Sequence, residues 1–301
     1  MKNRQLSQHI FDDLKSGCLH PFVDAVLNDN TLDIEFRGDS FNIYYRGGSL
    51  FKVSHSANGY AVSFDENYDI SKSGNICGTP IISDAIKNIP VYKQTMDRWF
   101  SQNPKLEREC QQLIVRENNA SSIANSTDYF MADMEYTCND DISGRFDIIG
   151  IKWLSKGSER KNVNKPVLSL IELKYGDGAL KNDAGIKKHL DDFEAFIKDQ
   201  KKIDDLCKDM SVVFRQKCEL GLISCLKDSQ FNICISPRDI EVMFIFANHD
   251  PESKILANEL QNISQSNYDF PVRVAVSSIM GYGVYKTVGI DEFKSMLYTN
   301  L

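Results

Sequence analysis

The nine residues LSLIELKYG (Leu168–Gly176) decide the fold, because they combine the composition of a buried strand with two charged residues near its end. Side chains alternate between the faces of a strand, so Glu172 and Lys174 share one face and lie roughly 7 Å apart. Leu168 and Leu170 precede them on that face. Taking a charge out of water costs several kcal/mol unless a partner compensates it. The end of this strand is therefore predicted to hold a metal, a counter-charge or a functional site.

The segment RFDIIGIKW (residues 145–153) shows the same feature one strand earlier. Asp147 is expected on the face of Ile149 and Ile151, where it is a single acid among apolar residues. Such a placement again indicates a partner or a function for the carboxylate.

A third strand is expected over YFMADMEYT (residues 129–137). Period two places Asp133 and Glu135 on one face together with Tyr129 and Met131. The three neighbouring strands are therefore predicted to bring their acids together.

The surrounding sequence predicts an α/β fold whose order is helix, three strands, helix, strand. Helices are recognised by apolar residues at three- and four-residue spacing, and buried strands by short apolar runs. The expected elements are a helix over 91–119 that Pro104 breaks or bends, strands over 129–137, 144–153 and 166–175, a helix over 183–203, and strands over 241–247 and 272–276.

The N-terminal part has a different character. Short strand-like runs separated by Gly-rich turns occupy residues 31–68: LDIEF, FNIYY, LFKV and YAVSF. They predict a small β-meander, followed by a polar passage up to Pro90. We therefore expect a β-rich N-terminal module over residues 1–90 and a second domain over residues 91–301.

Composition narrows the class of protein. The chain has 301 residues, 42% of them hydrophobic and 26% charged, which is typical of a globular protein. No export signal and no apolar run long enough to cross a bilayer is seen, so a cytoplasmic location without membrane insertion is expected. The eight cysteines form no paired Cys-x-x-Cys motifs, which favours reduced thiols over a zinc site. The net charge of −7 argues against a uniformly basic surface that coats nucleic acid.

The predicted acid cluster suits Mg²⁺ or Mn²⁺, which prefer carboxylate oxygens. Asp147, Glu172 and the backbone carbonyl between Glu172 and Lys174 are the expected ligands. A cation there lowers the pKa of a bound water and polarises a phosphoryl oxygen. Lys174 is expected to position that water or to stabilise the developing negative charge.

The pattern D-x(24)-E-x-K, formed by Asp147, Glu172 and Lys174 on successive strands between two helices, resembles the PD-(D/E)xK nuclease superfamily. The resemblance covers about residues 91–276, and one departure is Phe146 before the acid, where many members have proline. It implies a restriction endonuclease-like core with a mixed sheet, and a Mg²⁺- or Mn²⁺-dependent nuclease acting on DNA. RNA as a substrate and a homodimer as the assembly stay open.

Further residues are candidates for the same site. Glu135 is a possible third metal ligand, with a water-facing edge position as the alternative. His189 and Asp192, on the following helix, could lie beside the site, or His189 could be structural. Acids of the first helix, Glu109 and Glu117, are more typical of a solvated face. A basic rim for phosphates could come from a set of lysines and an arginine, namely Lys156, Arg160, Lys161, Lys165, Lys181, Lys187 and Lys188.

Two other functions compete with the nuclease. One is a non-catalytic module for binding nucleic acid or protein on the same fold, which the intact acid, acid and lysine set argues against. The other is a structural ion-pair network in an unrelated α/β protein, in which Lys174 neutralises both acids.

Overall fold

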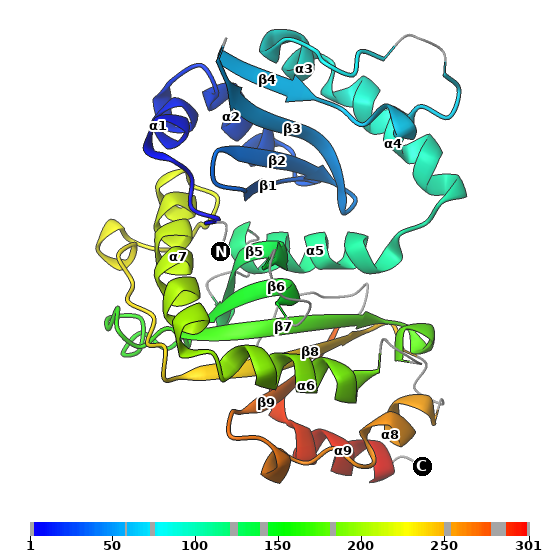
Figure 1. Ribbon diagram of the computed structural model, residues 1–301, viewed down its shortest axis with the longest axis vertical. Helices are drawn as coiled ribbons and strands as arrows, with labels where there is room; N and C mark the ends of the chain where they lie inside the picture. Colours follow the sequence, from blue (N-terminus) through cyan, green and yellow to red (C-terminus); the bar gives the residue numbers. More distant parts are fainter. Residues whose placement is uncertain are drawn as a thin grey trace.

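The structure is a computed structural model with two β-sheets and helices on both, so the mixed α/β class is confirmed (Figure 1). The described residues are 3–57, 59–72, 76–120, 126–138, 144–180, 185–249, 254–277 and 287–299. Within these ranges, no helix combines the length and apolar character that crossing a membrane requires.

The first sheet is the expected meander, with antiparallel strands in the order β1-β2-β3-β4. Its strands are β1 (Leu32–Phe36), β2 (Ser40–Tyr45), β3 (Gly48–Ser56) and β4 (Gly59–Ser63). The turn between β2 and β3 is tight, because Arg46 and Gly47 have φ values of 52° and 72°. A Cβ atom on Gly47 would lie 2.3 Å from the backbone carbon of Arg108, so glycine is needed for this close approach.

Helices that the sequence did not predict accompany this sheet. They are α1 (Gln8–Ser16), α2 (His20–Asn28) and α3 (Ile82–Lys87). Phe22 of α2 packs against Phe41 and Phe51 of the sheet, with ring centroids 5.7 and 6.4 Å apart. The N-terminal part is therefore a sheet with its own helical layer.

The helix expected over residues 91–119 is two helices separated at Pro104, as predicted. They are α4 (Ile89–Gln102) and α5 (Leu106–Ala120). Tyr92 of α4 packs on the first sheet, 4.9 Å from the ring of Phe51. Helix α5 lies between the two sheets (Figure 1). Its buried Gln112 accepts a hydrogen bond from the Gly47 backbone at 2.6 Å, which fixes α5 to the first sheet.

The second sheet has six strands in the order β10-β9-β8-β7-β6-β5. Its strands are β5 (Tyr129–Thr137), β6 (Arg145–Lys152), β7 (Val167–Tyr175), β8 (Ile240–Ala247), β9 (Val272–Ser277) and β10 (Val288–Gly289). The pairs from β5 to β7 are antiparallel, those from β7 to β9 are parallel, and β10 is antiparallel to β9. The sheet is therefore mixed, and its five long strands lie where the sequence predicted them.

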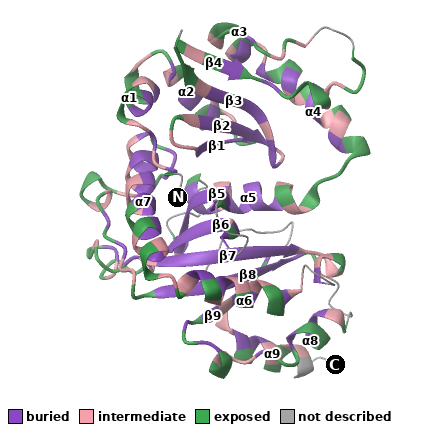
Figure 2. Cartoon of the chain, viewed as in Figure 1, coloured by how far each residue is buried: buried purple, intermediate pink, exposed green. Residues whose placement is uncertain are grey.

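Helices cover both faces of the second sheet. On one face, Ile114 of α5 packs with Ile171 of β7. On the other, α6 (Ile186–Ile197) and α7 (Gln200–Glu219) pack on Leu168 and its neighbours. Figure 2 shows the central strands buried along most of their length. The helix expected over 183–203 is two helices, and its predicted start at residue 183 lies outside the described residues. Two more helices follow, α8 (Ile255–Leu260) and α9 (Ile290–Thr299).

Strand β5 departs from the predicted alternation. A bulge shifts its register between Met131 and Asp133, and Glu135 has a φ of 54°. Met131 and Met134 consequently pack in the same core cluster although they are three residues apart. The prediction that Tyr129, Met131, Asp133 and Glu135 share one face is therefore wrong, because the extra residue of a bulge reverses the faces.

Candidate active site

An open pocket of about 630 Å³ lies at one end of the second sheet, between α5 and α6. Its wall comes from five elements, so residues far apart in the sequence meet there. The lining residues are Glu107, Arg108 and Gln111 of α5, Glu135, Tyr136 and Thr137 of β5, Arg145, Phe146 and Asp147 of β6, Glu172 of β7, and Lys188, His189 and Asp192 of α6.

The pocket forms where β6 and β7 separate. Their pairing ends at Ile148 and Ile171, although both strands continue beyond this pair. The Asp147 carboxylate then accepts a hydrogen bond from the backbone N–H of Leu173 at 2.8 Å. The carbonyl of Leu173 points the same way as its N–H, because a residue in a strand directs both groups toward one neighbour. A carboxylate and a backbone carbonyl therefore face the same opening.

The pKa of Asp147 shows how unfavourable its charge is. Burial raises the pKa of this carboxyl well above its usual range, and the charge of Glu172 raises it further. The hydrogen bond from Leu173 and the charge of Lys174 act in the opposite direction but are weaker effects. Asp147 and Glu172 are therefore close enough to repel each other, as predicted for a shared site.

Glu172, Lys174 and His189 form one polar group, in which Glu172 and Lys174 are buried and His189 is partly exposed. The Lys174 ammonium donates to Glu172 Oε1 at 2.8 Å and contacts His189 Nε2 at 2.9 Å. His189 Nε2 also lies 3.2 Å from Glu172 Oε1. Burial raises the pKa of Glu172 although Lys174 lowers it. Burial and the charge of Lys174 lower the pKa of His189 to about 4, so its imidazole is neutral at pH 7 and can accept from Lys174.

The other candidate residues also lie at the pocket. Glu135 lines it, but its carboxylate is engaged: Tyr44 donates to Oε2 at 3.1 Å, and Arg108 Nε lies 3.3 Å from Oε1. Asp192 also lines the pocket, and its charge contributes to the raised pKa of Glu172.

One acid was missed by the sequence reasoning. Glu107 of α5 lines the pocket, and its charge raises the pKa of both Asp147 and Glu172. The residue considered instead, Glu109, forms an ion pair with Arg46 at 2.9 Å. Glu107 and Gln111 are four residues apart and so share a helix face. This four-residue spacing is visible in the sequence, but it does not indicate which face of the helix packs toward the pocket.

The basic residues at the pocket differ from most of those expected. Arg108, Arg145 and Lys188 line it. Arg160 is buried and donates to the carbonyl of Thr127 at 2.6 Å, so it has a structural position. Lys181, also expected in this rim, lies outside the described residues.

Two carboxylates and a carbonyl, from Asp147, Glu172 and Leu173, are the donor atoms that this end of the sheet offers to a hard cation. Mg²⁺ suits such a set because it retains several waters. In the part of the chain that the structure describes, no group of three or more His, Cys, Asp or Glu side chains is arranged to hold a metal ion. Comparison with protein-family models, with curated proteins and with solved structures gives no match for this chain.

Proposed function

We propose that this chain is a metal-dependent nuclease that hydrolyses DNA phosphodiester bonds at the pocket around Asp147 and Glu172. One observation carries the proposal: Asp147 and Glu172, two acids with raised pKa values, line one open pocket, and the lysine beside them, Lys174, pairs with Glu172 at 2.8 Å. One lysine offsets only one of two negative charges, so the pair favours binding of a further cation.

The order of elements supports the same proposal. Helix α5, strands β5 to β7, helices α6 and α7, and strand β8 follow one another along the chain. The acid and the E-x-K motif lie at the adjoining ends of β6 and β7. This arrangement is what the resemblance to the PD-(D/E)xK superfamily implies, and we propose a restriction endonuclease-like core on that ground.

Each residue has a proposed role. Asp147, Glu172 and the Leu173 carbonyl would hold Mg²⁺ or Mn²⁺, and Glu135 of the same pocket would contact a water of the hydrated ion. When bound, the cation supplies Lewis acidity, which polarises a phosphoryl oxygen and favours ionisation of water. Lys174 would orient the attacking water and stabilise charge on the phosphate. Neutral His189 holds the Lys174 ammonium in place at 2.9 Å.

The charge of the pocket explains why a cation is needed. Five acidic and three basic side chains line it: Glu107, Glu135, Asp147, Glu172 and Asp192 against Arg108, Arg145 and Lys188. When all five acids are ionised, such a surface repels an anionic phosphodiester. A divalent cation reverses the balance at the acids, and the three basic residues then contact neighbouring phosphates.

A structural ion-pair network explains less of the geometry. Lys174 and Glu172 do form a buried pair at 2.8 Å. Among the described residues, however, no ion pair reaches Asp147, whose carboxylate accepts from a backbone N–H. In a network that served only stability, the Asp147 carboxylate would be a desolvated charge without a counter-charge, which destabilises the folded state. The destabilising Asp147 carboxylate also argues against a non-catalytic module that only binds nucleic acid or protein, because such a module has no use for this charge.

The proposal is tested by incubating plasmid, linear and single-stranded DNA with the protein and Mg²⁺ or Mn²⁺. The informative variants are Asp147→Asn and Lys174→Met. Matched controls are Asp191→Asn and Lys187→Met, two exposed residues that pair with each other on α6 and do not line the pocket.

We expect cleavage that requires metal, falls by at least about 100-fold in both pocket variants and persists in both controls. Cleavage that survives in Asp147→Asn, or that is lost equally in the controls, would contradict the proposed site. No cleavage of any substrate by a folded wild type would favour the non-catalytic module.

A further inference from the structure

Strand β5 has an irregular backbone where it lines the pocket. Glu135 has a φ of 54°, and the register shifts between Met131 and Asp133. A residue with a side chain persists in the left-handed region only when its surroundings hold it there. The conformation of residues 133–135 therefore depends on contacts from outside the strand.

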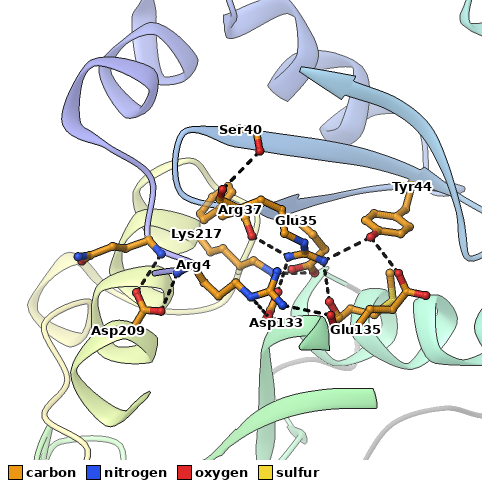
Figure 3. Close-up of polar contacts among 12 residues, drawn as sticks. Arg4, Glu35, Arg37, Ser40, Tyr44, Asp133, Glu135, Asp209 and Lys217 are labelled. Atoms are coloured by element: carbon orange, nitrogen blue, oxygen red, sulfur yellow. Dashed lines mark hydrogen bonds and ion pairs between the residues drawn. The ribbon is translucent and has the colours of Figure 1, made fainter. Parts of the chain in front are cut away.

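Two arginines supply these contacts (Figure 3). Arg37, which directly follows β1, donates to Asp133 Oδ1 at 2.6 Å and to the Met134 carbonyl at 2.7 Å. Arg4 donates to the Glu135 carbonyl at 3.2 Å, and its Nε lies 3.1 Å from Asp133 Oδ2. The buried Asp133 is thus an anchor for two forked donors, whose remaining N–H groups bind the carbonyls of the irregular segment.

Arg4 is itself held in place by α7. The Asp209 carboxylate of α7 accepts from the backbone N–H groups of Arg4 and Gln5, at 2.7 and 2.9 Å. Beside them, Glu35 of β1 and Lys217 of α7 form an ion pair at 2.8 Å that is almost fully buried. The N-terminal segment and the first sheet are therefore both bonded to α7 at this point.

The first sheet also reaches the carboxylate that lines the pocket. Tyr44 of β2 donates to Glu135 Oε2 at 3.1 Å and accepts from Arg37 Nη2 at 3.3 Å. Figure 3 shows the Tyr44 hydroxyl between the Arg37 guanidinium and the Glu135 carboxylate. Within the first sheet, therefore, Arg37 holds the backbone next to Glu135 through the Met134 carbonyl, while Tyr44 contacts the Glu135 carboxylate.

We propose that Arg37 is a positioning residue, which holds residues 133–135 of β5 in the irregular conformation that places Glu135 in the pocket wall. Tyr44 completes this function by orienting the Glu135 carboxylate. The first sheet is then part of the active-site framework. The catalytic consequence of this inference rests on the proposed nuclease function, whereas the structural consequence does not.

The structural consequence is tested by amide hydrogen exchange with Arg37→Lys, which keeps the charge but lacks the forked donors. Arg46→Lys is the matched control, because Arg46 lies at the other turn of β2 and pairs with Asp97 and Glu109. We expect exchange of amides 133–138 to accelerate at least about tenfold in Arg37→Lys only. Unchanged exchange there, or the same acceleration in Arg46→Lys, would overturn the proposal.

The catalytic consequence is tested with Tyr44→Phe, which removes one hydroxyl, and with Tyr45→Phe as control. The Tyr45 hydroxyl contacts Asp97 and does not face β5. We expect Tyr44→Phe to raise the Mg²⁺ concentration for half-maximal cleavage several-fold, while Tyr45→Phe leaves it unchanged. Equal metal dependence in both variants would overturn this role of Tyr44. If the wild type cuts no DNA, the proposed function fails, but amide exchange still decides the role of Arg37.

Discussion

Replacing Asp147 by asparagine should stabilise the metal-free protein at alkaline pH, although the residue belongs to the candidate active site. The amide oxygen of asparagine can accept the same hydrogen bond from Leu173 N, which is 2.8 Å long in the wild type. The substitution therefore changes little except the charge. It removes the repulsion with Glu172 and the burial of one carboxylate, the two main causes of the raised pKa of Asp147.

The magnitude follows from the separation of the two charges. Asp147 and Glu172 come directly after the last paired residues, Ile148 and Ile171, where the strands separate, so we take a distance of roughly 7 Å. Two charges at that separation repel each other by about 2 kcal/mol at an effective dielectric constant of about 20. Lys174 offsets part of this, so we expect the free energy of unfolding to rise by about 1–2 kcal/mol. The melting temperature should rise by about 3–6 °C.

The assay is chemical denaturation with a chelator present, between pH 5 and pH 8. Because the folded pKa of Asp147 is raised, the unfolded wild type holds fewer protons than the folded form above the ordinary pKa. Wild-type stability therefore falls as the pH rises toward the folded pKa, and the advantage of the variant should grow over the same range.

Asp191→Asn, on the exposed surface of α6, serves as the control and should show no such gain. Adding Mg²⁺ should stabilise the wild type more than Asp147→Asn and so close the gap. The reasoning is refuted if the variant is no more stable than the wild type at pH 8, or if its advantage does not depend on pH.

Two further predictions concern buried ionisable groups. The wild type should lose stability as the pH falls from 6.5 to about 4, because burial lowers the pKa of His189 in the folded protein to about 4 and the unfolded chain takes up the proton first. His189→Gln should reduce this loss, which denaturation curves at each pH measure. Titration of the His189 ring near pH 6.5 in the folded protein would contradict the prediction. Lys217→Met at pH 9, above the pKa of about 8 to which burial raises Glu35, should lower the free energy of unfolding by about 3–5 kcal/mol. Adding Glu35→Gln should recover part of that loss in calorimetric melting, and no recovery would show that the pair is not the cause.

Local patterns predicted the long strands of the second sheet. The segment 129–137 was expected as a strand and is one, because apolar composition and period two act over a few residues. Pro104 separates α4 from α5 for an equally local reason, since its ring and missing N–H disrupt a helix. Asp147 and Glu172 meet because consecutive antiparallel strands bring their adjoining ends together.

The parts that were not predicted depend on contacts between distant segments. The bulge in β5 is held by Arg37, which is 96 residues away from Asp133, and period two carries no information on such a contact. Glu107 lies at the pocket because hydrogen bonds to the first sheet set the orientation of α5. One of them is donated by the Gly47 N–H to the Gln112 side chain. Helices α1 and α2 are short, and short helices take most of their stability from packing.

Calorimetric titration of the wild type with Mg²⁺ and with Mn²⁺ tests the central claim most directly, that Asp147 and Glu172 are arranged to bind a divalent cation. Measured near pH 6 in buffers of different ionisation enthalpy, binding should release protons, because the carboxyls must ionise to bind. Asp147→Asn should lose both the binding and the proton release, while Asp191→Asn keeps them. Absence of binding by a folded wild type, or unchanged binding by Asp147→Asn, would contradict the claim.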